Sequence, residues 1–281
     1  MRASNGDASS VAVTTPAPGA TAAMPLASHG RHAKPRTPVL RSAAATAALG
    51  TAAAAVSVLG SGTAQAAPAG HSNVAMLGST GPAFHAPTRV GSAQQVITVQ
   101  SNGSYATVTA WQIGATGWQQ VVSTTAGRVG ANGVTNGLTR TQGTNTTPTG
   151  TFTITQGFGV APNPGTRMPY HQVTAHDWWV EDPTSAYYNQ MRTDTQGGFH
   201  LTEAGDDGSE HLINYPTQYH NALVINFNMD PAVQGRGAGI FLHDLSSSAG
   251  PTAGCVAVPA SVLTKIMTWI DPAAHPVIVI S

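Results

Sequence analysis

The chain has 281 residues, a formal net charge of zero and only 9% charged residues. After an N-terminal segment of 66 residues, acidic side chains outnumber basic ones by eleven to seven, and the basic ones form no stripe. This weakly acidic balance argues against nucleic acid as a partner, because phosphate backbones are held mainly by Lys and Arg. The remaining length is enough for one large domain.

The first 66 residues predict an export signal. Basic residues gather in 31–41, an uncharged Ala-rich run follows in 42–60, and a small-x-small pattern stands at 64–66. These are the three parts of a secretory signal, so we expect a secreted, cell-wall location. An uncleaved membrane anchor is the alternative, although an Ala-rich run is weakly hydrophobic for spanning a bilayer. The long stretch before the basic cluster fits a start downstream of Met1.

Residues 67–94 are rich in Pro, Gly and Ala and predict a linker. Organised sequence begins at Gln95 and gives the expected domain, 95–281. Its first strands are expected at 96–99, 105–113 and 118–122, with an Asn-Gly hairpin turn between the first two. Strands so closely spaced predict an antiparallel sheet.

A segment rich in Gly, Thr and Asn (128–150) precedes a predicted strand at 151–155. Residues 163–195 then hold most of the aromatic side chains, mixed with charged ones, and show no regular periodicity. Two interpretations stay open for this segment. It is either an irregular loop fixed by aromatic burial, or a wall or lid of an active site, where long loops are common.

The C-terminal part predicts a strand at 223–228, with Leu223, Ile225 and Phe227 toward the core, and a second β-favouring run at 256–258. It further predicts a helix at 261–270 and a last strand at 276–280. The helix has an apolar stripe at helical spacing and follows Pro259, which is favourable at a first turn. The fold class is therefore mostly β, with one short C-terminal helix packed on the sheet.

Cys255 is the only cysteine, and it stands twelve residues after His243. A single thiol cannot form an internal disulfide, and an exposed free thiol outside the cell is liable to oxidation, which favours a functional role. With a His as base and unhindered main-chain N–H groups beside Gly254, the pattern predicts a site of cysteine acyl transfer. The alternative is a small buried hydrophobic residue near an ordinary strand-end histidine.

Other hydrolase chemistries are disfavoured. The organised region has seven histidines but no H-E-x-x-H motif, and Glu210-His211 alone is a weak metal signal. The G-x-S-x-G elbow of serine hydrolases does not occur in the sequence. We therefore expect neither a metal nor an organic cofactor.

Three short motifs follow one another along the chain. They are T-P-T-G-T-F at 147–152, G-I-F-L-H at 239–243 and T-A-G-C-V at 252–256. This order resembles the catalytic-domain family of L,D-transpeptidases (YkuD-like), in its exported actinobacterial form, over 95–281. The resemblance implies a β-sandwich of the type found in that family.

By position in these motifs, Cys255 corresponds to the nucleophile and His243 to its general base. Gly254 corresponds to the glycine whose main chain, with that of Cys255, helps to form the oxyanion hole. Thr252 corresponds to the Ser or Thr that begins the cysteine motif. Two positions differ from the family pattern, because Ala253 replaces a His and Ala257 stands where Arg or Asn is common; the spacer before the motif is also shorter.

The resemblance implies an acyltransferase acting on peptidoglycan stem peptides. The cysteine would form a thioester with release of D-Ala and pass the acyl group to an amine, giving a 3→3 cross-link, or to water, giving an L,D-carboxypeptidase. Carbapenem-type inhibitors would acylate the same thiol. The alternative, favoured by Ala253 and Ala257, is a non-catalytic wall-binding or structural β-domain with an inert, buried thiol.

Overall fold

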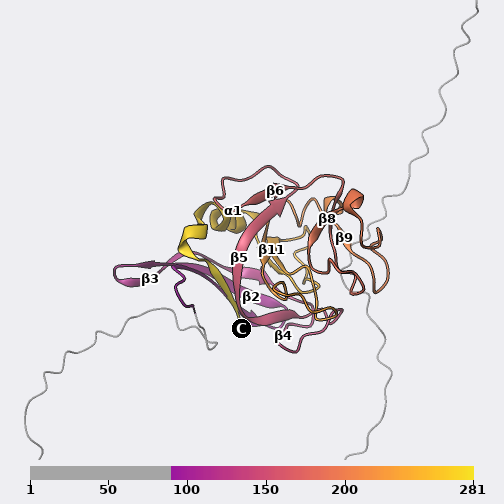
Figure 1. Cartoon of the computed structure of the whole chain (residues 1–281). Coiled ribbons are helices and arrows are strands. Elements are labelled where there is room, and N and C mark those ends of the chain that lie inside the picture. The colour runs from indigo at the N-terminus through magenta and orange to yellow at the C-terminus, as the bar shows by residue number, and fades with distance from the viewer. Residues whose placement is uncertain (1–89) are drawn as a thin grey trace, which may run out of the picture. The chain divides into compact units, whose positions relative to one another are not determined.

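The computed structural model describes residues 90–281 (Figure 1). The predicted export signal (1–66) and the predicted linker up to residue 89 lie outside the described residues. The elements that the structure describes are β1 (Gln95–Asn102), β2 (Tyr105–Gly114), β3 (Gly117–Arg128), β4 (Val134–Asn136), β5 (Thr147–Gly159), β6 (Tyr170–Gln172), β7 (Asp177–Trp179), β8 (Met191–Thr193), η1 (Asp194–Gln196), β9 (Glu210–His211), η2 (Leu212–Asn214), β10 (Ala222–Ile225), β11 (Phe241–Asp244), β12 (Val256–Val258), α1 (Ala260–Trp269), η3 (Pro272–Ala274) and β13 (Val277–Ile280).

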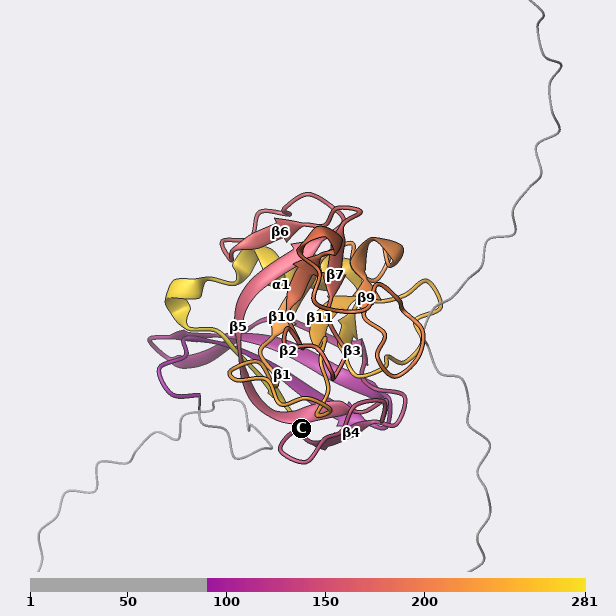
Figure 2. The ribbon, with the colours of Figure 1, turned by 45° about the vertical axis from the view of Figure 1, so that its right-hand side comes forward.

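The main sheet closes on itself. Its strands follow the order β10-β11-β12-β3-β2-β1-β13-β5, and β5 also pairs with β10, which joins the two ends. Figure 2 brings β10 and β11 into view beside the long strand β5. The expected class, mostly β with one short helix, is confirmed. The described sheet is barrel-like, however, in place of the predicted sandwich of two separate sheets, because the β5–β10 pairing leaves no open edge between them.

The predicted antiparallel pairing of the first, closely spaced strands is confirmed, and the sheet as a whole is mixed. β1, β2 and β3 are joined by hairpins and are antiparallel, and Gly103, with φ of 62°, supplies the left-handed turn residue after Asn102. The last strand, β13, instead lies parallel to β1 and antiparallel to β5. Hairpin signals report only neighbours in sequence, so the parallel pairs between distant segments left no local pattern to read.

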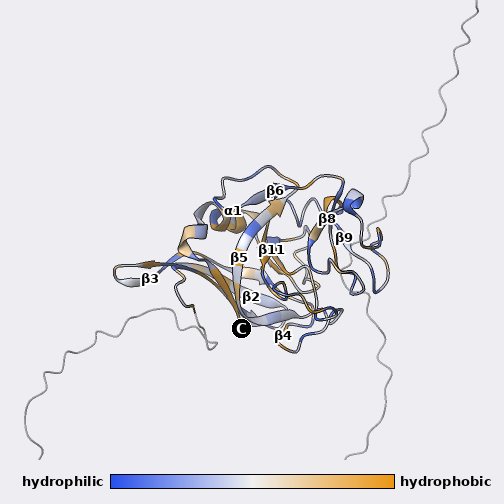
Figure 3. Ribbon diagram, in the orientation of Figure 1, coloured by the Kyte–Doolittle hydropathy of each residue, from blue (hydrophilic) through white to orange (hydrophobic). Residues whose placement is uncertain are grey.

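The core lies between the sheet and helix α1. Leu263, Ile266 and Met267 of the helix are fully buried against Leu242 and Val256 of the sheet. Burying side chains of this size stabilises the fold by about 1.5–3 kcal/mol each. In Figure 3 the apolar colours are clearest at β11 and on part of α1, whereas β4 and the segment around β8 and β9 carry more of the pale and hydrophilic colours. Helix α1 and β12 occupy the residues predicted for them within one position.

The predicted strand at 223–228 is shorter than expected and is buried on both faces. β10 ends at Ile225, after which the N–H of Phe227 bonds back to the carbonyl of Ile225. Leu223 faces the main core as predicted, but Val224 on the opposite face packs into a second cluster. We call this second group the aromatic cluster; its buried members are Phe158, Val173, Trp179, Leu212, Tyr215, Tyr219, Ala222, Val224, Phe241 and Cys255.

The segment 163–195 contains more regular structure than its sequence indicated. Strand β7 pairs with β8 and β9 in a small three-stranded sheet, separate from the main one. Trp179 on β7 is fully buried, and its ring meets that of Phe241 on the main sheet at 4.8 Å between centroids, edge to face. Burial of aromatic side chains therefore fixes this segment against the strand that also carries His243.

Candidate active site

Strands β11 and β12 place the cysteine and histidine motifs side by side. The two strands are parallel, with Leu242 opposite Val256 and His243 opposite Ala257. Cys255 immediately precedes β12. Because side chains alternate along a strand, Cys255 and Ala257 share one face with Phe241 and His243. The structure thus brings the predicted nucleophile and base onto the same face of adjacent strands, two residues apart in register.

The Cys255 side chain is almost wholly enclosed and has polar neighbours. Its residue exposure is 9%, and it is a free thiol. The sulfur lies 3.2 Å from the main-chain carbonyl oxygen of Gly239, to which the thiol donates, and 3.4 Å from the N–H of Phe241, from which it accepts. The thiol is therefore part of the aromatic cluster and is also hydrogen-bonded to the chain that leads into β11.

The surroundings of Cys255 keep its thiol protonated. Burial raises the pKa of this thiol well above its ordinary value, and the carboxylates of Glu210 and Glu181 raise it further. The Phe241 N–H and the positive charge of Arg140 act in the opposite direction and lower the pKa. Because the effects that raise the pKa of Cys255 outweigh those that lower it, the thiol is neutral in the resting state. Any nucleophilic step therefore needs a base to remove its proton.

His243 is buried, with 4% exposure, and its ring is fixed on two sides. Its Nδ1 lies 2.7 Å from the main-chain carbonyl oxygen of Asp244. A carbonyl only accepts hydrogen bonds, so in the neutral ring Nδ1 carries the proton and Nε2 is the basic nitrogen. The ring of Tyr219 meets the imidazole edge to face at 5.6 Å. This is the tautomer that a general base acting through Nε2 requires.

Thr252 and Gly254 form the turn that immediately precedes Cys255. The Thr252 hydroxyl donates to the carbonyl of Cys255 at 2.6 Å and accepts from the N–H of Gly254 at 3.1 Å. Gly254 has φ of 154°, and a Cβ there would stand 3.1 Å from both the Ile240 side chain and the Thr146 carbonyl. The structure therefore uses Gly254 to make room, while its N–H, expected to face an oxyanion, is bonded to Thr252.

Thr147 is a contact of the site that the sequence analysis did not single out. Its fully buried hydroxyl lies 3.2 Å from the carbonyl of Cys255, to which it donates, and 2.9 Å from the N–H of Gly130, from which it accepts. The carbonyl of Cys255 thus accepts hydrogen bonds from two threonine hydroxyls, that of Thr252 in the same turn and that of Thr147 at the start of β5. The signal was present in the sequence, because Thr147 begins the T-P-T-G-T-F motif.

Comparison with known proteins identifies the family of this domain. The family model described as the L,D-transpeptidase catalytic domain (YkuD) matches residues 92–279. The chain belongs to this family. Comparison of the sequence with curated proteins gave no match.

Solved structures with some likeness to this family member include Bd1075 of Bdellovibrio bacteriovorus, at 13% identity and a TM-score of 0.36, over 67% of this chain and 48% of that one. Another is the helical cell shape determining protein Pgp2 of Campylobacter jejuni, at 12% identity and a TM-score of 0.34, over 66% of this chain and 47% of that one. The chain therefore spans about half the length of these structures.

In this L,D-transpeptidase-family domain, the small sheet helps to hold the site. The side-chain oxygen of Asn189, a buried residue with φ of 63°, accepts from the N–H of Gly239 at 3.0 Å and from the Trp179 ring at 3.0 Å. The carbonyl of Gly239 in turn accepts a hydrogen bond from the thiol of Cys255. The interpretation of the aromatic segment as a loop fixed by aromatic burial thus describes the structure, and the segment also contacts the chain that leads into β11. Its role as a wall or lid of an active site stays a prediction.

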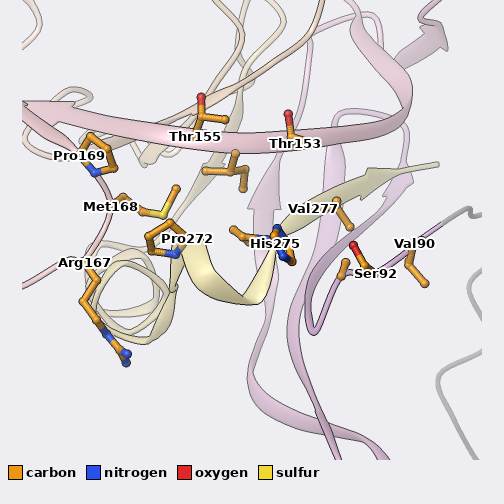
Figure 4. A pocket seen from close by; sticks show the side chains of 14 residues that line it. Val90, Ser92, Thr153, Thr155, Arg167, Met168, Pro169, Pro272, His275 and Val277 are labelled. Carbon is orange, nitrogen blue, oxygen red and sulfur yellow. The ribbon is translucent and has the colours of Figure 1, made fainter.

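The described residues also line an open pocket of about 760 Å³ that has no lining residue in common with the site (Figure 4). Thr153, Thr155 and Arg167 contribute to its lining, but Figure 4 shows the two hydroxyls and the guanidinium directed away from the interior. Arg167 pairs with Asp271. The interior of the pocket is therefore mainly apolar, which does not suit acyl-transfer chemistry.

Three other histidines of the domain lie beside carboxylates. His171 lies 3.0 Å from Asp177, His176 lies 2.9 Å from Asp194, and His200 lies 2.9 Å from Asp207. Across residues 90–281, no three His, Cys, Asp or Glu side chains are grouped so that they could hold a metal ion. Within the same range, no helix combines the length and apolar character needed to cross a membrane.

Proposed function

We propose that this domain is an exported cysteine acyltransferase that acts on peptidoglycan stem peptides, with Cys255 as nucleophile and His243 as general base. The observation that carries the proposal is the placement of these two side chains on one face of the parallel strands β11 and β12, with the imidazole held in the tautomer whose Nε2 is basic. Membership of the L,D-transpeptidase catalytic-domain family supports the substrate class.

The first half-reaction forms a thioester. Nε2 of His243 takes the thiol proton as the sulfur of Cys255 attacks the carbonyl carbon of the L,D-peptide bond that precedes a terminal D-Ala. The carbonyl oxygen gains the negative charge. When the carbonyl re-forms, the C–N bond breaks and the imidazolium gives its proton to the departing D-Ala amine. A neutral thiol and a neutral imidazole are the correct starting pair for this sequence.

The second half-reaction releases the acyl group. A side-chain amine of a neighbouring stem peptide, or water, attacks the thioester carbonyl and loses a proton to His243. The C–S bond breaks, and the sulfur recovers its proton from the imidazolium. An amine acceptor gives a 3→3 cross-link, and water gives L,D-carboxypeptidase activity.

The turn before β12 gives the proposed oxyanion site its shape. Since the N–H of Gly254 bonds to Thr252, we assign the main-chain N–H of Cys255 as the hydrogen-bond donor to the oxyanion. Gly254 contributes space, and the hydroxyls of Thr252 and Thr147 fix the carbonyl side of the Cys255 peptide. Fixed donors of this kind stabilise a tetrahedral intermediate without having to reorient during the reaction.

The test is D-Ala release from a disaccharide tetrapeptide. We expect Cys255→Ala and His243→Gln each to lower the release rate by at least about a thousandfold, as for other nucleophile and base removals, while the thermal transition stays within a few degrees of wild type. His275→Gln, a change at an exposed histidine away from β11, is the matched control and should retain activity. Turnover by folded Cys255→Ala would refute the proposal.

A carbapenem provides an independent probe. The thiol should open the β-lactam ring and keep the whole inhibitor as a thioester on Cys255, seen by mass spectrometry of the intact protein and mapped by digestion. Cys255→Ala should show no addition.

A second candidate function is a non-catalytic wall-binding domain with an inert thiol. The observation that favours it is the near-complete enclosure of Cys255, whose thiol is engaged with Gly239 and Phe241. This candidate predicts binding to purified peptidoglycan without D-Ala release, and no reaction of the native thiol with iodoacetamide or a carbapenem. The two sets of assays therefore separate the candidates completely.

A further inference from the structure

Arg140 is a buried cation that lies against the cysteine turn. It belongs to the segment between β4 and β5, and its exposure is 5%. Its Nε donates to the carbonyl of Thr146 at 2.8 Å, and its Nη1 donates to the carbonyl of Arg236 at 3.2 Å. These bonds fix the plane of the guanidinium, because its N–H donors point in set directions.

Two glycines from different parts of the chain leave the space that the guanidinium occupies. A Cβ on Gly237, where φ is 111°, would overlap Nη1 of Arg140, and a Cβ on Gly254 would stand 2.8 Å from Nη2. Nη2 is therefore directed at the residue that immediately precedes the thiol. A side chain at either glycine would displace the charge from this position.

The position matters because β12 itself supplies no cation. Position 257, on the same face of the strand and two residues beyond the thiol, is an alanine. The carboxylates of Glu181 and Glu210 raise the pKa of the Cys255 thiol, and Arg140 is the positive charge that lowers it. In turn, burial lowers the pKa of Arg140 while Cys255, Glu181 and Tyr188 raise it. The guanidinium and the thiol thus act on each other through a poorly solvated space.

We propose that Arg140 is the positioning residue that stabilises the negative charge formed at Cys255 during acyl transfer, first on the sulfur and then on the oxyanion. The inference rests on the proposed function for the second charge, since an oxyanion forms only if acyl transfer occurs. The effect on the sulfur requires only the thiol, so it can be measured without any peptidoglycan substrate.

The competing role for Arg140 is purely structural. Its hydrogen bonds tie together the segments around Thr146 and Arg236, and loss of these bonds alone would loosen the loops. A structural role predicts that Arg140 variants are less stable, and that the rates of alkylation by anionic and neutral reagents change by the same factor. A charge effect instead predicts a change in the preference of the thiol for anionic over neutral reagents.

The experiment measures alkylation of native Cys255 by iodoacetate and by iodoacetamide, in wild type, Arg140→Met and Arg236→Met. The two reagents react by the same displacement of iodide and differ in charge, so the ratio of their rates reports the local potential and cancels changes in access. We expect Arg140→Met to lower the iodoacetamide rate at pH 8 by about tenfold, since a nearby opposite charge is worth at least about one pKa unit. The iodoacetate rate should fall by a further factor of about three to ten, so that the iodoacetate-to-iodoacetamide ratio falls by that same factor.

Arg236→Met is the matched control. Both guanidinium groups lie over the ring of Phe227, at 5.7 Å for Arg140 and 5.9 Å for Arg236, and both donate to main-chain carbonyls. The control should leave the reagent ratio within twofold of wild type. Equal ratios in wild type and Arg140→Met, or an equal fall in Arg236→Met, would overturn the proposal.

Arg140→Lys covers the case in which Arg140→Met does not fold. Lysine keeps the charge and loses the bonds to the Thr146 and Arg236 carbonyls, whereas Arg140→Gln loses the charge as well. We therefore expect the reagent ratio of Arg140→Lys to lie closer to wild type than that of Arg140→Gln. This difference should hold even where the thermal transitions of the two variants are alike. If Lys and Gln give the same ratio, the charge is not responsible. If an Arg140 variant loses D-Ala release while its reagent ratio stays that of wild type, the proposed effect on the sulfur is wrong. If the ratio changes but the wild-type protein itself shows no turnover, only the acyltransferase assignment is refuted.

Discussion

The thiol of Cys255 donates a hydrogen bond to the main-chain carbonyl of Gly239, with 3.2 Å between sulfur and oxygen. The proton on the sulfur is therefore part of the resting structure. Gly239 is held by the side chain of Asn189 at its N–H, so the small sheet, the chain entering β11 and the sulfur form one connected arrangement. In the proposed reaction, His243 removes this proton as the substrate arrives.

The pH dependence of alkylation tests the state of the thiol. Because burial raises the pKa of Cys255, we expect the iodoacetamide rate of the native protein to rise by about tenfold per pH unit from pH 6 to 9 without a plateau. The same chain in urea should titrate near the ordinary cysteine pKa of about 8.5. A native profile that levels off below pH 7 would show a resting thiolate and contradict this description.

Asp244, the neighbour of His243, predicts a pH-dependent stability. Its side chain is buried, and within residues 90–281 its Oδ1 has no hydrogen-bond partner. Burial raises the pKa of this carboxyl to about 7, with a small opposing effect from the Asn221 N–H. The folded state therefore holds the proton more tightly than the unfolded chain, and the stability contributed by this group is complete below about pH 4 and is lost as pH rises through about 7.

Asp244→Asn removes this titration. We expect the variant to melt within a degree of wild type at pH 5, where the wild-type carboxyl is neutral, and about 2–4 °C above it at pH 8.5, a shift that corresponds to roughly 1 kcal/mol in a domain of this size. Melting curves at the two pH values measure the difference. A gap that is the same at both, or that is larger at pH 5, would show that Asp244 does not titrate as described.

Thr252→Val tests the turn that delivers Cys255. The change keeps the shape of the side chain but removes one donor and one acceptor, leaving the Gly254 N–H and one bond of the Cys255 carbonyl unsatisfied. We expect a loss of about 1–3 kcal/mol in the free energy of unfolding and a fall in kcat with little change in KM. Thr264→Val, on the exposed side of α1, should lose less than about 0.5 kcal/mol. Equal losses at the two positions would argue against the role assigned to Thr252.

Patterns that are local in sequence predicted their parts of the structure well. The Asn102-Gly103 turn, strand β12 and helix α1 each depend on residues within a few positions, and the structure has them where the sequence indicated. Closure of the sheet depends on the pairing of β5 with β10, which lie far apart in sequence. No local periodicity records such a pairing, so the residue pattern gave only the mostly-β class. The sandwich was what the family resemblance implied, and the sheet is barrel-like.

The same distinction applies to the site. Cys255 and His243 stood out because one is the only thiol and the other ends an apolar run, and both prove to lie on one face of β11 and β12. Arg140 did not stand out, since a buried cation has no spacing signature. Thr147 begins the T-P-T-G-T-F motif, but its contact with the distant carbonyl of Cys255 depends on the fold. The protonated state of the thiol was also beyond the sequence, because it results from the enclosure that the aromatic cluster creates.

The most direct test of the central claim is the covalent intermediate itself. Wild-type protein should be mixed with a disaccharide tetrapeptide, quenched in acid within seconds and weighed intact. The proposed function predicts an adduct on Cys255 with the mass of the substrate less D-Ala. Hydroxylamine should remove this adduct, because it cleaves thioesters. Cys255→Ser should give no hydroxylamine-sensitive thioester adduct. Substrate that is consumed with release of D-Ala while the sulfur never carries an acyl group would contradict it.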